Sequence, residues 1–113
     1  MYIRIYEYDV NKDEKNVLEI EATSNIIYFN GNTKNISNSF ESKNRIRNII
    51  NSNIEILENL QNLRISNYKG GRQKQMTIFA NNKIYNILGN TDNENSVSIY
   101  NKLKEEIISI YEL

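Results

Sequence analysis

The sequence predicts an α+β fold: an antiparallel sheet built from two three-stranded meanders, with two helices on one of its faces. Two observations lead to this prediction. Several segments alternate apolar and polar residues, as half-buried strands do. Two longer segments repeat apolar residues every three or four positions, as amphipathic helices do. With 113 residues the chain has room for one core, so we expect a single domain over residues 1–113.

Three strands are expected first, over 2–9, 17–22 and 26–29, with a polar turn at 11–16 between the first two. Side chains alternate across the first strand, so its aliphatic and aromatic members point in opposite directions. One side carries Ile3 and Ile5, and the other carries Tyr2, Tyr6 and Tyr8.

A helix is expected after the polar residues 31–38, which interrupt the strand pattern. Asn38 and Glu41 have the spacing of a capping box. An apolar stripe then recurs at helical spacing, formed by Ile46, Ile49, Ile50, Leu57 and Leu60. Asn53 falls on this stripe, so the pattern leaves open a break in the helix near residues 51–53.

The second half has the same order of elements. Segments 63–69 and 72–80 alternate and flank Gly70–Gly71, a pair that supplies the positive φ angles of a primed hairpin turn. Asn81–Asn82 forms a second tight turn before a strand at 83–88.

The last helix begins after a second capping box, formed by Thr91 and Glu94. Its broad apolar face consists of Val97, Tyr100, Leu103, Ile107, Ile110 and Tyr111. The predicted element order is therefore βββα-βββα.

The two halves, residues 1–59 and 60–113, are consistent with an internal duplication. GNTKN at 31–35 matches GNTDN at 89–93 at four of five positions, with an offset of 58 residues. The same offset aligns several isoleucines. The alternative is coincidence, because asparagine and isoleucine are frequent throughout the chain.

The segment YKGGRQKQ, residues 68–75, invites comparison with a phosphate-binding loop. Such loops have the pattern GxxxxGK[ST] or GxGxxG and open a helix, whose N-terminus receives the phosphate. Here the glycines lie between two alternating segments. We therefore interpret them as a hairpin turn.

The hairpin over residues 64–83 is basic, since no acidic residue lies between Glu58 and Asp92. The residues near its tip are Tyr68, Lys69, Arg72 and Lys74. Basic residues beside an aromatic one suit single-stranded nucleic acid or an acidic protein surface. They are also common on solvated strands, where lysine discourages aggregation. The formal charge of zero, from 14 basic and 14 acidic residues, makes nucleic acid the weaker of the two binding hypotheses.

Candidates for catalysis are few. The chain has no histidine to transfer protons near neutral pH and no cysteine nucleophile. Asp9 and Asp13 lack the loop pattern of a calcium site. The sequence predicts a protein without catalytic residues, metal or cofactor.

The tyrosines of the first strand have two interpretations. If the helices cover Ile3 and Ile5, then Tyr2, Tyr6 and Tyr8 form a half-hydrated outer face. The functional interpretation is a tyrosine-rich binding surface, because tyrosine offers a large contact area at a small entropic cost.

Composition suggests the setting. Asparagine, isoleucine, lysine and tyrosine have A/T-rich codons and are frequent, while proline is absent, which points to a low-GC bacterium or its phages. The charged N-terminus is no signal peptide, and no apolar run reaches the ~20 residues that span a bilayer. We expect a cytoplasmic protein, in the producing bacterium or in an infected host cell.

The leading functional hypothesis is a small non-enzymatic module that binds another protein. In a phage or mobile element it would serve as an inhibitor of a host defence protein, or as an immunity protein against a toxin. The alternative is a nucleic-acid-binding module that uses the basic hairpin 64–83. We expect no membrane partner, and the sequence permits a homodimer.

Overall fold

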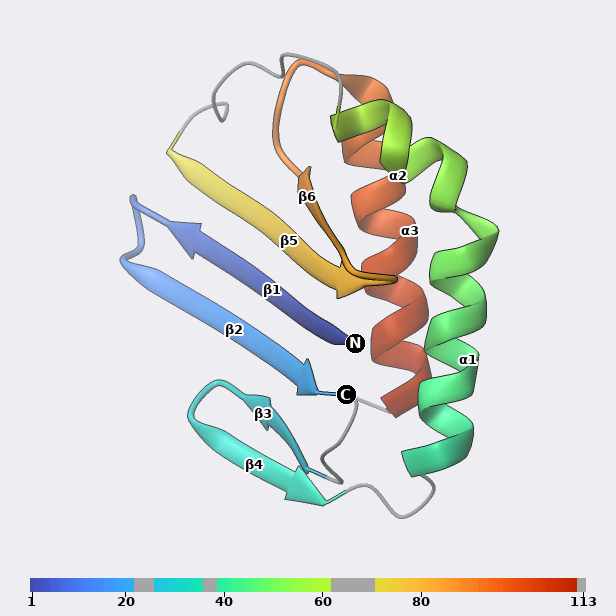
Figure 1. Ribbon diagram of the computed structural model, residues 1–113. Coiled ribbons are helices and arrows are strands. Elements are labelled where there is room, and N and C mark those ends of the chain that lie inside the picture. The colour runs from blue at the N-terminus through green and yellow to red at the C-terminus, as the bar shows by residue number, and fades with distance from the viewer. Residues whose placement is uncertain (22–25, 36–38, 62–70, 112–113) are drawn as a thin grey trace.

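The computed structural model describes residues 1–21, 26–35, 39–61 and 71–111, and its fold is α+β as predicted (Figure 1). The elements follow in the order β1 (Tyr2–Asp9), β2 (Glu14–Glu21), β3 (Ile26–Phe29), β4 (Asn32–Asn35), α1 (Ser39–Ser52), α2 (Ile54–Gln61), β5 (Arg72–Ala80), β6 (Lys83–Leu88) and α3 (Glu94–Tyr111). None of the helices in these ranges is long and apolar enough to cross a membrane.

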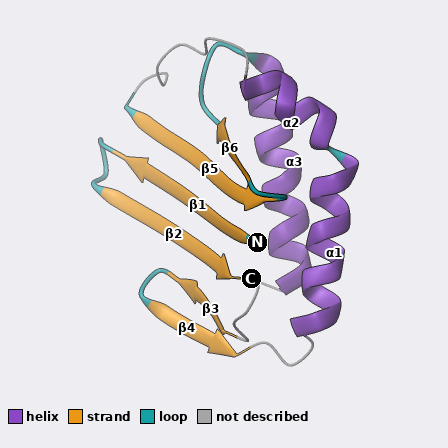
Figure 2. Ribbon diagram, viewed as in Figure 1, coloured by secondary structure: helices purple, strands orange, loops and turns teal. Residues whose placement is uncertain are grey.

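The strands form one antiparallel sheet with the spatial order β4-β3-β2-β1-β5-β6 (Figure 2). The first strand of the chain lies inside the sheet, because β1 pairs with β2 on one side and with β5 on the other. Ile3 shows this arrangement, since it is paired with Ile20 in β2 and with Ile78 in β5.

The strand β4 was not predicted. Asn30 and Gly31 have positive φ angles of 48° and 86°, and they join β3 to β4 through a two-residue turn in which Phe29 pairs with Asn32. Asn-Gly is the typical sequence of a primed hairpin turn. The residues 31–38, which we expected to interrupt the sheet, therefore begin with a fourth strand. The first meander has four strands instead of three.

The predicted hairpin around the paired glycines is not reproduced in the described residues. The segment 63–69 and Gly70 lie outside them, and β5 already has β1 and β6 as its two neighbours. Gly71 has a φ of 58°, and its carbonyl accepts a hydrogen bond from the Val10 amide at 2.9 Å. Gly71 thus continues the pairing of β1 with β5, and a strand follows it, not a helix.

The second predicted turn is confirmed. Asn81 and Asn82 have φ angles of 55° and 61°, and they connect Ala80 to its partner Lys83 across the β5–β6 hairpin. Asparagine visits this left-handed region more readily than most residues, which explains its use at both positions.

The helices α1, α2 and α3 all lie on one side of the sheet (Figure 1). The first predicted helix is broken, as its pattern permitted, by the buried Asn53. The Asn53 amide nitrogen Nδ2 donates to the Ile49 carbonyl at 2.7 Å, while the backbone carbonyl of Asn53 accepts from the Leu57 amide at 3.0 Å. Lys102 Nζ in α3 donates to Asn53 Oδ1 at 3.2 Å. Asn53 therefore ends one helix, begins the next and ties both to α3.

The N-cap of α3 lies two residues after the predicted capping residue Thr91. Asn93 Oδ1 accepts a hydrogen bond from the Ser96 amide at 3.0 Å, so Asn93 is the N-cap. Thr91 Oγ1 instead accepts from the Asn93 amide and shapes the turn before the cap. The predicted capping residue Asn38 of the first helix lies outside the described residues.

The core lies between the sheet and the helices. The strands contribute the side chains that alternate toward the helices, and α3 contributes a continuous stripe. The fully buried members include Ile3, Ile20, Ile27, Ile46, Ile50, Leu57, Met76, Ile78, Tyr85, Ile87, Tyr100 and Leu103.

The predicted duplication is not confirmed. The 58-residue offset does relate β2 to β5 and β3 to β6 in register, since the pair Ile20–Ile27 becomes the pair Ile78–Tyr85. However, β3 lies beyond β2 on one side of β1, whereas β6 lies beyond β5 on the other side. Both β2 and β5 run antiparallel to β1 and turn equivalent side chains toward the helices. The two hairpins therefore have opposite hands, and no rotation superimposes them.

Candidate functional site

The face of the sheet that points away from the helices carries no described element, and we call it the open face (Figure 2). The shortest extent of the molecule is 21 Å, which corresponds to two layers, one of sheet and one of helices. Strand alternation assigns to this face the side chains of Tyr2, Arg4, Tyr6, Tyr8, Lys15, Val17, Glu19, Glu21, Tyr28, Thr33, Asn35, Gln73, Gln75, Thr77, Phe79, Ile84, Asn86 and Leu88.

Strand register arranges these residues in rows across the sheet. One apolar row runs from Tyr2 to its partner Phe79 and on to Ile84. Phe79 is 43% exposed and Ile84 is 59% exposed, and both lie beside the turn that joins β5 to β6. A second row, which mixes apolar and polar residues, joins Val17, Tyr6, Gln75 and Leu88.

A polar row lies between these two and crosses all six strands. Its members in order are Thr33, Tyr28, Glu19, Arg4, Thr77 and Asn86. At its centre Arg4 Nε lies 3.8 Å from Glu19 Oε1, and the Arg4 guanidinium lies 5.1 Å from the centre of the Tyr6 ring. The row pairs its own charges, so the open face has a neutral centre with aromatic flanks.

Tyr2 lies in the row next to the Arg4–Glu19 pair, and the pKa of its hydroxyl responds to that pair. Burial raises the pKa of its hydroxyl above the ordinary value, and the negative charge of Glu19, together with a hydrogen bond to that carboxylate, adds to the effect. Tyr2 is therefore a neutral hydrogen-bond donor at physiological pH.

The structure brings the predicted tyrosines together. Tyr2, Tyr6 and Tyr8 share the open face and are all half-buried, as the alternation of the first strand indicated. The Tyr8 hydroxyl donates to Asp13 Oδ1 at 2.8 Å, which fixes its position at the turn end of the face. Sequence reasoning missed Phe79 and Ile84 as their neighbours, because only the register of β5 against β1 places them beside Tyr2.

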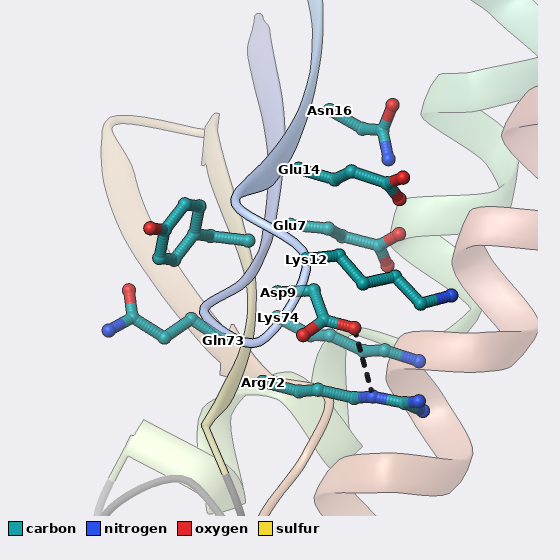
Figure 3. Close-up of a pocket in the computed structure, with 9 residues that line it drawn as sticks. Glu7, Asp9, Lys12, Glu14, Asn16, Arg72, Gln73 and Lys74 are labelled. Carbon is teal, nitrogen blue, oxygen red and sulfur yellow. Dashed lines mark ion pairs between the residues drawn. The ribbon is translucent and has the colours of Figure 1, made fainter.

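The predicted basic residues lie elsewhere. Arg72 and Lys74 extend to the helix side of the sheet, opposite to Gln73 (Figure 3). Tyr68 and Lys69 lie outside the described residues. The predicted candidates therefore do not form a single surface.

The basic strand β5 pairs along its length with β1, which carries acidic residues. Register places Lys74 opposite Glu7 and Arg72 opposite Asp9, and Arg72 Nε lies 3.4 Å from Asp9 Oδ2. At the other end of the sheet Lys83 Nζ lies 3.0 Å from Glu58 Oε1. Much of the positive charge of β5 and β6 is therefore balanced within the fold.

Glu7 is the most firmly held acidic side chain on the helix side. The Tyr100 hydroxyl donates to its Oε2 at 2.7 Å, and Lys104 Nζ donates to its Oε1 at 2.7 Å. Burial tends to raise the pKa of this carboxyl, but the two hydrogen bonds and the charges of Lys104 and Lys74 outweigh burial and lower it below the ordinary value. Glu7 is thus ionised at neutral pH.

Comparisons of the chain with protein-family models, with curated proteins and with solved structures found no match.

Proposed function

We propose that this protein is a non-enzymatic module that binds another protein through the open face of its sheet. The observation that carries the proposal is the exposed apolar row, in which Phe79 and Ile84 continue the half-buried Tyr2 across three strands. Contiguous apolar surface of this kind is typical of interaction sites, whereas scattered exposed apolar residues are ordinary.

The composition of the face supports the same function. Tyrosine, phenylalanine and arginine are enriched at the centres of protein interfaces, and unpaired charges are depleted there. The open face combines four tyrosines with Phe79 and with an arginine that is already paired to Glu19. The two longer extents of the molecule, 38 and 34 Å, span a face comparable with the ~800 Å² that each partner contributes to a standard interface.

The decisive experiment compares two surface variants in affinity capture from a lysate of the source organism. We expect the tagged double variant Phe79→Ser, Ile84→Thr to lose a stoichiometric partner that the unaltered protein retains. Phe40→Ser is the matched control, because Phe40 is 80% exposed but lies on α1, in the helix layer. Retention of the partner by the double variant, or its loss with Phe40→Ser alone, would contradict a binding site on the open face.

The setting remains a proposal based on composition. A small protein whose frequent residues have A/T-rich codons, and which lacks histidine and cysteine, suits a phage or mobile element. There it would block a host defence protein or act as an immunity protein. The captured partner identifies which of the two roles applies, because a defence nuclease and a cognate toxin are distinguishable by sequence.

Nucleic-acid binding through residues 64–83 is the less supported alternative. Phosphate-driven binding needs several basic groups that are free to replace counterions. Arg72 and Lys83 are each within ion-pair distance of a carboxylate, Asp9 and Glu58 respectively. An oligonucleotide titration at low salt tests this alternative, and an affinity that falls steeply with salt and with Arg72→Ala plus Lys74→Ala would support it.

A further inference from the structure

Two adjoining hollows lie near the β1–β2 turn. Most of the residues that line them point to the helix side of the sheet, although Tyr8, Val17 and Gln73 of the open face also border them. The first is polar, about 250 Å³ in volume, and is lined by Glu7, Tyr8, Asp9, Lys12, Glu14, Asn16, Arg72, Gln73 and Lys74 (Figure 3). The second is mainly apolar, about 260 Å³, and is lined by Ile5, Glu7, Asn16, Val17, Leu18, Phe29, Lys104 and Ile108. Glu7 and Asn16 line both hollows, so the two adjoin at these side chains.

The apolar hollow has room for a short hydrocarbon chain. Its deep walls are Ile5 and Leu18 on the sheet, and Ile108 closes it from α3. Phe29 lies at its edge and is 38% exposed. A dry apolar cavity of ~150 Å³ holds a benzene molecule, so a hollow of about 260 Å³ has the capacity for a chain of several methylene groups.

The charges around the polar hollow favour a negatively charged group. Together the two linings contain four cations, Lys12, Arg72, Lys74 and Lys104, and three carboxylates, Glu7, Asp9 and Glu14. Arg72 pairs with Asp9, and Lys104 pairs with Glu7. Four cations against three carboxylates leave an excess of one positive charge.

The polar groups at the junction are mainly donors. Both oxygens of Glu7 already accept a hydrogen bond, from Tyr100 and from Lys104, so this carboxylate is engaged within the fold. The Lys104 ammonium has three hydrogens and uses one of them for Glu7. Asn16 Oδ1 accepts from Asn30 Nδ2 at 2.9 Å, which directs the acceptor atom of Asn16 away and leaves its amide hydrogens for a ligand.

We propose that this site binds a small amphiphilic anion. Its hydrocarbon chain lies in the apolar hollow against Leu18 and Ile108. Its anionic head lies at the junction, where Lys104, Lys74 and Asn16 donate hydrogen bonds to it. A carboxylate and a phosphate monoester present the same acceptor chemistry to these donors, and both belong to the proposed class.

Isotope-labelled protein titrated with sodium octanoate, octyl phosphate, 1-octanol and octylammonium tests the proposal by methyl chemical shifts. We expect both anions to perturb the methyl resonances of Ile5, Leu18 and Ile108, octanol to do so more weakly, and octylammonium to bind least. Stronger binding of octyl phosphate than of octanoate would identify a phosphate head, and the reverse a carboxylate. Shifts confined to other residues, or equal binding of octanol and both anions, would overturn the proposal.

Two variants test separately where the anionic head and the hydrocarbon chain of the ligand bind. We expect Lys74→Gln to weaken octanoate binding roughly two- to fivefold and to leave octanol unaffected. Lys83→Gln is the matched control, because Lys83 lies in the distant β5–β6 turn and pairs with Glu58. Ile108→Trp fills the apolar hollow and should abolish binding of all four probes, with circular dichroism to verify folding. Octanoate affinity that Lys74→Gln leaves unchanged would refute the assigned head position.

Discussion

Glu7 joins the first strand of the chain to its last helix. Its partners Tyr100 and Lys104 lie 93 and 97 residues away in the sequence, and its side chain is 18% exposed. Hydrogen bonds to an ionised and largely buried group are among the stronger polar contributions to stability. This carboxylate therefore links β1 directly to α3.

The variant Glu7→Gln should lower the free energy of unfolding by about 1–3 kcal/mol at pH 7, because Lys104 loses its anionic partner. The pKa of Glu7 is lowered in the folded state, so its contribution is complete above the ordinary carboxyl pKa and is lost as pH falls through the folded-state value. Urea denaturation at pH 7 and pH 3 checks this. The difference in stability between the two proteins should be smaller at pH 3 than at pH 7, and a constant difference would contradict the assignment.

Gly71 is required where β5 begins beside the end of β1. Its φ is 58°, and a Cβ at this position would clash with Val10 Cγ1. We expect Gly71→Ala to cost about 1–3 kcal/mol in urea denaturation, from backbone strain and from this contact. Val10→Ala should recover the steric part, because it removes the methyl group concerned. Equal stability of Gly71→Ala and the unaltered protein would show that the turn relaxes freely.

At the level of elements, α2 protects one edge of the sheet. Gln61 Oε1 accepts from the Asn86 amide at 3.0 Å, and Gln61 Nε2 donates to the Asn86 carbonyl at 3.1 Å. One side-chain amide thus occupies both outward backbone groups of a residue in β6. A partner strand would need these same groups, so the contact guards the edge against strand addition.

Gln61→Ala should expose that edge and promote self-association. We expect a loss of about 1 kcal/mol in the free energy of unfolding and a faster rise of light scattering on heating, because the two hydrogen bonds between the Gln61 side chain and the Asn86 backbone are lost. Gln73→Ala is the control, because Gln73 is exposed and lies on the open face of β5. Identical scattering by the two variants would argue that Gln61 has no protective role.

Alternation predicted the strands and their faces well, because a period of two is a local property of the chain. It failed at β4, whose sequence NTKN has no apolar residue to alternate, although the preceding Asn30–Gly31 is a typical hairpin turn. The break at Asn53 was visible as a polar residue on an apolar stripe. The order of strands was not predictable, because pairing between residues some 70 positions apart leaves no local pattern.

The same limit applies to the candidate site. Tyr2, Tyr6 and Tyr8 could be assigned to one face from their spacing alone. Their neighbours Phe79 and Ile84 could not, since these join the row only through the pairing of β1 with β5 and of β5 with β6. The proposed site for an amphiphilic anion likewise depends on α3 lying over β1 and β2, an arrangement that no segment of the sequence indicates by itself.

For the molecule as a whole, β1 should be the most stable part of the sheet. All eight of its residues pair on both sides, whereas β4 has four residues and pairs on one side. We expect amide hydrogen exchange to be slowest in β1 and its neighbour β5 and fastest among the strands in β4. Exchange measured by NMR at neutral pH checks this order, and faster exchange in β1 than in β4 would contradict the strand order.

The central position of β1 also has a consequence for synthesis on the ribosome. Strand β1 leaves the exit tunnel well before its second neighbour, β5 (Arg72–Ala80), is translated. In a nascent chain that ends after α2, β1 can pair with β2 on one side. Its other edge is unpaired, because β5 has not yet been synthesised. Until residues 72–80 emerge, that edge is a site where chaperones, or a neighbouring nascent chain, can pair in place of β5.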